Sequence, residues 1–119
     1  MIAELKSIDS LDIDLDSFEP EEPGTFSFFL DAFIGPWNSP GGEHFQIQVC
    51  TPQWLLKNHT ESDALFGFHL LIVFDYNKKV IAEKIQRYCE RCTGESWEEV
   101  AQQLCLIGLW EFENYTPNE

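Results

Sequence analysis

The sequence predicts an α+β protein with a mostly antiparallel sheet of four to six strands, two C-terminal helices packed on one face, and one short additional helix. Three observations carry this prediction. Residues 69–74 are a short, mostly apolar run rich in Ile, Val and Phe, which is typical of a buried strand. Residues 76–92 and then 97–106 place apolar side chains at steps of three and four, which is typical of amphipathic helices. Residues 109–115 alternate apolar and polar side chains, as a strand does.

Three further strands are expected before this unit. Residues 2–8 are expected to form the first. Residues 25–34 carry apolar side chains on both faces, so this strand is expected to be central and covered on both sides. Residues 44–50 alternate apolar residues with glutamines, which indicates a half-exposed strand. Residues 35–42, with two prolines and three glycines, form the hairpin loop between these last two strands.

The three expected helices have recognisable first residues. Thr51, followed by a proline, is an N-cap with proline at the first helical position of a short helix. Asp75 is expected to cap the helix over residues 76–92. Ser96 and Glu99 have the spacing of a capping box, so the next helix starts almost at once.

Length and composition indicate one domain over residues 1–119. A hydrophobic content of 44% supplies a core, in which Ile85, Trp97 and Leu104 are expected to be buried between the C-terminal helices and the sheet. No stretch of eighteen apolar residues exists, so no membrane span is expected. Residues 1–6 lack the basic start and apolar run of a secretion signal, which predicts a cytoplasmic protein.

The formal net charge of −14 is unevenly distributed. Residues 1–56 hold ten acids and one base, Lys6, and residues 92–119 hold six acids and no base. Residues 75–91 hold five bases and three acids, so the long helix carries most of the positive charge. Such a surface repels nucleic acid and anionic membranes and attracts basic proteins. Acidity also keeps a protein soluble without any partner, so charge alone does not choose between these interpretations.

Leucine or isoleucine alternates with aspartate through residues 10–18, which in a strand would give one dry and one charged face. A calcium loop starting at Asp12 would need glycine at its sixth position and glutamate at its twelfth, but Ser17 and Pro23 stand there. The segment is therefore expected to be a solvated acidic edge or loop, or a patch that binds a partner. The candidate partner-binding acids are Asp12, Asp14, Asp16, Glu19, Glu21 and Glu22.

Four cysteines, at positions 50, 89, 92 and 105, could indicate disulfides or a metal. In a cytosolic chain thiols stay reduced. Cys89 and Cys92 have the spacing of half a zinc site, but they lie on a helix face and no second such pair exists. The sequence favours four free, mostly buried thiols over a redox-labile pair or a metal site, and no metal or cofactor is expected.

No catalytic constellation is recognisable. None of the three histidines pairs locally with a serine or cysteine, and no nucleophile elbow, phosphate-binding loop or zinc-protease motif occurs. Glu111 and Glu113 share a face of the last expected strand and could form a carboxylate pair, but the exposed side of an edge strand explains them equally well. The sequence therefore predicts neither an enzyme nor a small-molecule substrate.

Four segments together resemble the immunity protein 8 family of bacterial polymorphic toxin and contact-dependent growth inhibition systems. They are Phe33-Ile34-Gly35-Pro36, Cys50-Thr51-Pro52-x-Trp54-Leu55, Ser96-Trp97-Glu98-Glu99-Val100-Ala101 and Gly108-x-Trp110-Glu111-Phe112-Glu113-x-Tyr115. The resemblance implies an α+β protein of the cytosol, encoded beside a toxin, that binds and blocks that toxin's C-terminal domain. The family brings no catalytic residues to carry over.

The charge of −14 fits a toxin that is a nuclease with a basic cleft, which this chain would occlude. The acidic segment described above is the first expected contact surface, with Glu111 and Glu113 as a second. Trp37, in the glycine-rich loop, is a candidate anchor because binding hot spots favour tryptophan; the alternative is a lid over the sheet. The alternative function is a small acidic adaptor module with a different protein partner.

Overall fold

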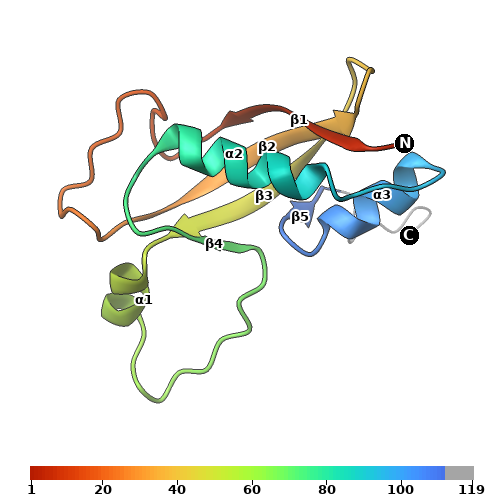
Figure 1. Cartoon of the computed structure of the whole chain (residues 1–119). Coiled ribbons are helices and arrows are strands. Elements are labelled where there is room, and N and C mark those ends of the chain that lie inside the picture. Colours follow the sequence, from red (N-terminus) through yellow and green to blue (C-terminus); the bar gives the residue numbers. More distant parts are fainter. Residues whose placement is uncertain (112–119) are drawn as a thin grey trace, which may run out of the picture.

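The computed structural model describes residues 1–111, and Figure 1 shows one sheet with helices α2 and α3 lying along the same side of it. Three long strands build the sheet: β1 (Ala3–Asp9), β2 (Ser27–Pro36) and β3 (Glu43–Cys50). They follow one another as an antiparallel meander, in the places that the sequence predicts.

The register of the meander aligns apolar residues of neighbouring strands. Leu30 of β2 lies opposite Ile47 of β3, and Ile34 of β2 lies opposite Leu5 of β1. Because side chains alternate along a strand, this register gathers the apolar positions on one side of the sheet. A register shift in β1, between Leu5 and Ser7, keeps Ile8 on that same side.

Two short strands share the other edge of β3. β5 (Leu109–Trp110) is antiparallel to it, whereas β4 (Leu70–Ile72) is parallel, so the sheet is mixed and the predicted α+β class is confirmed. β4 has three residues rather than six, because His69 has a left-handed φ of 58° and Phe74 is 81% exposed beyond the ladder. The expected continuation of the last strand, residues 112–115, lies outside the described residues.

The first helix explains why β4 is parallel to β3. α1 (Pro52–Asn58) starts at the predicted cap Thr51, whose hydroxyl oxygen accepts a hydrogen bond from the N–H of Trp54. The helix and the loop after it, residues 59–69, carry the chain back to Gln48, beside which Leu70 starts β4 in the same direction as β3. A parallel neighbour requires a crossover of this length.

The other two helices begin at side-chain caps. α2 (Lys78–Cys89) is capped by Asn77, so the expectation of Asp75 is wrong; that carboxylate instead accepts the N–H of its own neighbour, Tyr76. α3 (Trp97–Leu104) begins after the predicted cap Ser96. Within residues 1–111, no helix has the length and apolar character needed to cross a membrane.

The side of the sheet under α2 and α3 is the core face. Ile85 and Leu104 are buried there, as predicted, whereas Trp97 is only half-buried. The largest fully buried side chains of this core include Phe45, Leu30, Ile34, Ile47, Ile81, Leu104, Val49 and Val100. The expected arrangement of two C-terminal helices on one face is thus confirmed.

The opposite side of β2 and β3 is open to solvent, and we call it the open face. Its residues are Phe29, Asp31 and Phe33 of β2 and His44, Gln46 and Gln48 of β3. Phe29 is 47% exposed, so the expectation that residues 25–34 would be covered on both sides is wrong. The polar side chains that β3 contributes to this side leave too little apolar surface for a second layer.

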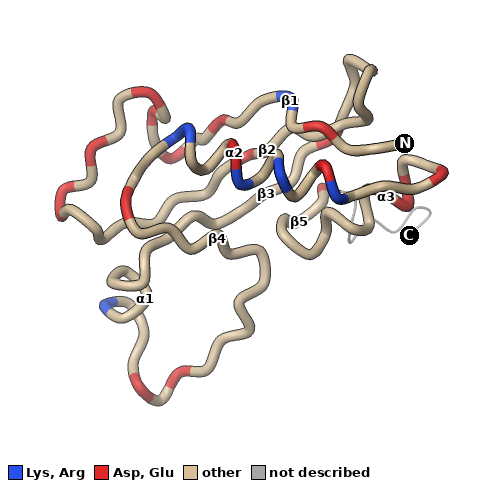
Figure 2. Tube along the Cα trace, in the orientation of Figure 1, with Lys and Arg blue, Asp and Glu red and all other residues tan. Residues whose placement is uncertain are grey.

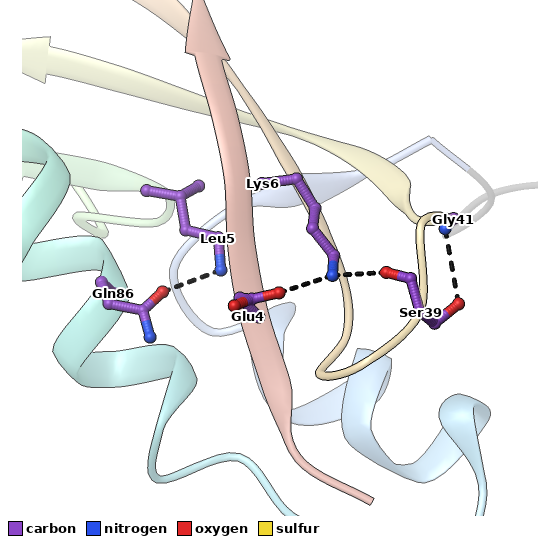
Figure 3. A network of polar contacts seen from close by, with 6 residues as sticks. All are labelled: Glu4, Leu5, Lys6, Ser39, Gly41 and Gln86. Atoms are coloured by element: carbon purple, nitrogen blue, oxygen red, sulfur yellow. Dashed lines mark hydrogen bonds and ion pairs between the residues drawn. The ribbon is translucent and has the colours of Figure 1, made fainter.

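Polar contacts tie β1 to its surroundings (Figure 3). Gln86 Oε1 of α2 accepts a hydrogen bond of 2.9 Å from the N–H of Leu5. Lys6 Nζ donates to Glu4 Oε1 at 2.6 Å and to the carbonyl oxygen of Ser39 at 2.5 Å. The side chain of Lys6 is 17% exposed. The only base among the first 56 residues is therefore engaged internally.

Candidate functional site

The acidic segment predicted before β2 is a loop of turns rather than an alternating strand. Asp14 Oδ1 accepts the N–H of Asp16 at 2.9 Å, and the Asp14 carbonyl accepts the N–H of Ser17 at 3.2 Å. Aspartate favours such local bonds, which replace the ladder of a strand. Leu15 is 7% exposed and fastens the loop to the core, so its neighbouring aspartates face solvent.

Figure 2 shows acidic residues spread along this loop and basic residues concentrated on α2. Lysines neutralise two of the loop acids. Asp16 Oδ1 lies 2.7 Å from Lys78 Nζ, and this hydrogen bond raises the pKa of Lys78. Glu22 Oε2 lies 3.0 Å from Lys57 Nζ. These two carboxylates are therefore less available to an external cation than their exposure suggests.

Two other loop acids, Glu19 and Glu21, are exposed and form no hydrogen bond or ion pair within residues 1–111. Their side chains are free to change rotamer. A partner that fixes them must overcome the lost rotamer entropy.

The open face carries two hollows that share Asp31 and Gln46. The first, of about 380 Å³, lies between residues 9–12 and Phe29. The second, of about 270 Å³, is lined in addition by His44, Leu109, Trp110 and Glu111. No lysine or arginine of the described chain lines either hollow. The fold thus brings Asp12 and Glu111, two separate candidates in the sequence, onto one continuous surface.

Each of the four acids on this surface uses one carboxylate oxygen for a local contact. Asp9 Oδ1 accepts the N–H of Ser10 at 2.8 Å, Asp12 Oδ2 accepts the N–H of Phe29 at 2.7 Å, Asp31 Oδ2 lies 2.7 Å from His44 Nδ1, and Glu111 Oε1 accepts the N–H of His44 at 3.1 Å. The second oxygen of each carboxylate has no partner within residues 1–111. These carboxylates are therefore held in place with one oxygen each available.

Sequence reasoning missed Asp9, Asp31 and Phe29 as site residues. The one local signal was a charge at Asp31 inside a mostly apolar strand. The residues next to Asp31 on the adjacent strand depend on the strand register, which places Asp9 directly opposite Asp31. Like charges in this position destabilise a sheet. The pairing of Asp9 with Asp31 therefore lowers the stability of the sheet, so folding alone does not explain it.

Trp37 follows β2 in the hairpin loop and is 62% exposed, which excludes the alternative of a lid over the sheet. Its N–H donates to the Ile2 carbonyl at 2.8 Å. Its side chain lines a separate hollow with Glu95 and Glu99 among others. Its role as a binding anchor stays a prediction, as does that of Glu113, which lies outside the described residues.

Glu43 is a further residue that the sequence did not single out. Its Oε1 accepts the indole N–H of Trp97 at 2.6 Å, and its Oε2 accepts that of Trp110. One carboxylate of β3 therefore fixes both α3 and β5. The partners lie 54 and 67 residues away, so no local pattern could reveal this structural contact.

The four cysteines are free thiols: Cys50, Cys89 and Cys92 are buried and Cys105 is half-buried. Burial raises the pKa of Cys89 to about 12, and the neighbouring Cys92 adds to the rise. Cys92 Sγ donates to the Tyr88 carbonyl at 3.3 Å. Burial likewise raises the pKa of Cys50 and Cys92, so these three buried thiols are protonated at neutral pH. No group of potential metal ligands occurs in the part of the chain that the structure describes.

A protein-family model, Immunity protein 8, matches residues 3–115 of the 119-residue chain. The chain belongs to the immunity protein 8 family. No curated protein and no solved structure matched it. As an immunity protein 8 chain it is an immunity protein with a toxin protein as its partner, and such proteins are typically not enzymes.

Proposed function

We propose that this immunity protein 8 chain works in the cytoplasm, binds one cognate toxin domain with 1:1 stoichiometry, and neutralises it by covering its active site or substrate cleft. The toxin domain is a nuclease. The observation that carries this proposal is the charge of the surface: 21 acids against seven bases, with the only base of the first 56 residues engaged internally. A nuclease cleft is basic because it binds phosphate, so the two surfaces attract each other.

The proposed mechanism needs no chemistry by this chain. Acidic side chains accelerate the encounter with a basic cleft, and close charge pairs that lose water on contact slow dissociation. Once bound, the immunity protein fills the space that the phosphate backbone would occupy. We therefore propose that it is not itself an enzyme. We propose that the contact surface is drawn from the exposed acids of this chain together with one aromatic side chain, the candidates being Asp12, Asp14, Asp16, Glu19, Glu21, Glu22, Trp37, Glu111 and Glu113.

Co-expression tests this proposal directly. The C-terminal domain of the toxin encoded beside this chain is produced in a bacterial host, alone and together with the immunity protein. We expect the toxin domain alone to stop growth and degrade nucleic acid, and the immunity protein to prevent both. A toxin domain that is harmless alone, or equally toxic with the immunity protein present, would contradict the proposal. If the toxin domain kills without degrading nucleic acid and the immunity protein still protects, the proposed neutralisation stands but the proposed nuclease activity is wrong.

The electrostatic part has its own test in vitro. The association rate of the purified pair should fall steeply as sodium chloride rises, because salt screens attraction between exposed charges over about 10 Å at 0.1 M. The dissociation rate should change much less. An association rate that is independent of salt would mean that steering by the acidic surface has no part in recognition.

A further inference from the structure

We propose that the open face of the sheet is the docking surface for the toxin, and that it binds a segment presenting arginine side chains around an apolar contact. This inference rests on the function proposed above and narrows it. Among the exposed acids it selects those that border the two hollows, Asp9, Asp12, Asp31 and Glu111, rather than the acidic loop as a whole.

The first argument is the apolar surface left uncovered there. Leu11 is 104% exposed, Phe29 is 47% exposed and Leu109 is 38% exposed, and all three line the two hollows. An aromatic residue left open in the middle of a sheet gains most from a partner that covers it, because interface energy concentrates in desolvated aromatic contacts. The Phe29 ring contributes little to the stability of the sheet, since no layer of the described chain buries it.

The second argument is that the carboxylates on this face are already ordered. Each is held by a local contact of 2.7–3.1 Å and keeps one oxygen available. By contrast, Glu19 and Glu21 have no local partner within residues 1–111, and Asp16 and Glu22 are paired with lysines. A partner therefore loses less side-chain entropy and displaces fewer ion pairs on the open face than on the loop.

The third argument concerns the chemistry of the occupant. No lysine or arginine of the described chain lines the hollows, so no permanent positive charge of the described residues compensates the carboxylates there. A guanidinium can donate hydrogen bonds to a carboxylate and at the same time stack on an aromatic ring. Asp12, Asp31 and Phe29 line one hollow and offer both contacts. A second copy of this chain fits poorly, because it would bring a net charge of −14 against the same acids.

Two double variants with equal charge change test the placement. The face variant, Asp9→Asn with Asp31→Asn, removes two carboxylates from the hollows and keeps an oxygen acceptor at each position. The matched loop variant, Glu19→Gln with Glu21→Gln, removes two that line neither hollow. A third variant, Phe29→Thr, keeps a β-forming residue but removes the ring. The probe is the toxin domain encoded beside this chain, carrying a catalytically inactive nuclease site.

We expect the face variant and Phe29→Thr each to raise the Kd by about 30-fold or more, and the loop variant by less than about 3-fold. The face variant should slow association, reduce its salt dependence and also speed dissociation, because it removes both steering charge and direct guanidinium contacts, whereas Phe29→Thr should act mainly on dissociation. Circular dichroism and urea unfolding verify that each variant is folded. Carbodiimide labelling provides a second readout without substitution: toxin binding should protect Asp31 and Glu111 but not Glu19 and Glu21.

The outcomes separate this inference from the proposed function. If the wild-type chain neither binds nor neutralises the toxin, the proposed function fails. If it neutralises the toxin and the folded face variant and Phe29→Thr bind equally well, the function stands and the docking surface is wrong. Loss of binding in the loop variant alone would place the interface on the loop. A dimer of the free chain that Phe29→Thr dissociates would assign the face to a second copy and would also overturn the inference.

Discussion

The two faces of the sheet differ in burial and composition although the same strands form both. On the core face, Leu30 and Phe45 are both 0% exposed and lie beneath helices. One residue along, Phe29 is 47% exposed and Gln46 is exposed. The core face is composed for stability, whereas the open face opposes Asp9 to Asp31, an arrangement that stability alone disfavours. The difference indicates that the composition of the open face is not explained by stability alone.

The largest effect is expected at the centre of the core face. Phe45→Ala should reduce the free energy of unfolding by about 3–5 kcal/mol, because it leaves a cavity at a position that is 0% exposed. Its neighbour on the open face is the matched control: Gln46→Ala should change the free energy by less than about 0.5 kcal/mol. Urea unfolding monitored by circular dichroism measures both. Similar losses at both positions would remove the distinction between the faces.

A second core-face prediction tests the packing of α3. Leu104→Ala should cost about 2–5 kcal/mol, since Leu104 is 0% exposed. The exposed Leu106, which is 76% exposed just after the helix, serves as the control and should tolerate alanine. A loss below about 0.5 kcal/mol for Leu104→Ala would show that the helix does not pack as described.

The buried polar residue at the end of β3 gives a third test. Thr51 is 1% exposed, and its hydroxyl oxygen accepts the N–H groups of Phe26 and Trp54, each at 3.2 Å. Thr51→Val keeps the shape but leaves both donors without an acceptor, which should cost about 1–3 kcal/mol. Thr51→Ser, which keeps the hydroxyl, should cost clearly less. Equal losses would mean that the methyl contact, which only Thr51→Ser removes, contributes as much as the hydrogen bonds, which only Thr51→Val removes.

The buried thiols make the core face sensitive to alkaline pH. The pKa of Cys89 is raised from 9.0 to about 12, so the unfolded chain loses this proton at a lower pH than the folded chain does. Its contribution to stability is therefore complete below pH 9.0 and declines as the pH rises toward 12. We expect Cys89→Ala to unfold with a flatter dependence on pH in that range. Parallel curves for the two proteins would contradict the assignment.

The smallest effect is expected on the open face and has the opposite sign. Asp9→Asn should stabilise the fold by about 0.2–1 kcal/mol, because it relieves the repulsion from Asp31 across the strands. Added salt should shrink the gain. Glu21→Gln, which removes an acid with no opposed carboxylate, is the control and should be neutral. A destabilised Asp9→Asn would mean that the carboxylate's contact with Ser10 outweighs the repulsion.

Local patterns carried most of the fold. Alternation located β1 and β3, a mostly apolar run located β2, and side-chain caps located the start of α1 and α3. The errors arose where two local options compete. Asp75 and Asn77 can both cap a helix, and the choice depends on how the chain leaves β4. Residues 10–18 have a strand pattern, yet Asp14 makes turns that satisfy the backbone locally.

The candidate site was predictable only in part, because it depends on pairing between distant residues. Composition indicated an acidic surface, and the aspartates of the loop are exposed. The lysines that neutralise Asp16 and Glu22 come from elements 62 and 35 residues away, so the sequence could not show which acids stay available. The meeting of Asp12, Asp31 and Glu111 likewise required the register and the position of β5.

The shared edge of β3 has a consequence for how the chain reaches its native state. β1, β2 and β3 pair with their neighbours in sequence, so the meander can form early during synthesis. The other edge of β3 is paired only when residues 70–72 and, later, residues 109–110 have been added to the chain. Closing such long loops slows folding, and an unpaired edge invites aggregation in the interval. We expect a nascent chain arrested before residue 109 to be unprotected along Phe45 and Gln46, and chaperone dependence to be greatest at that length.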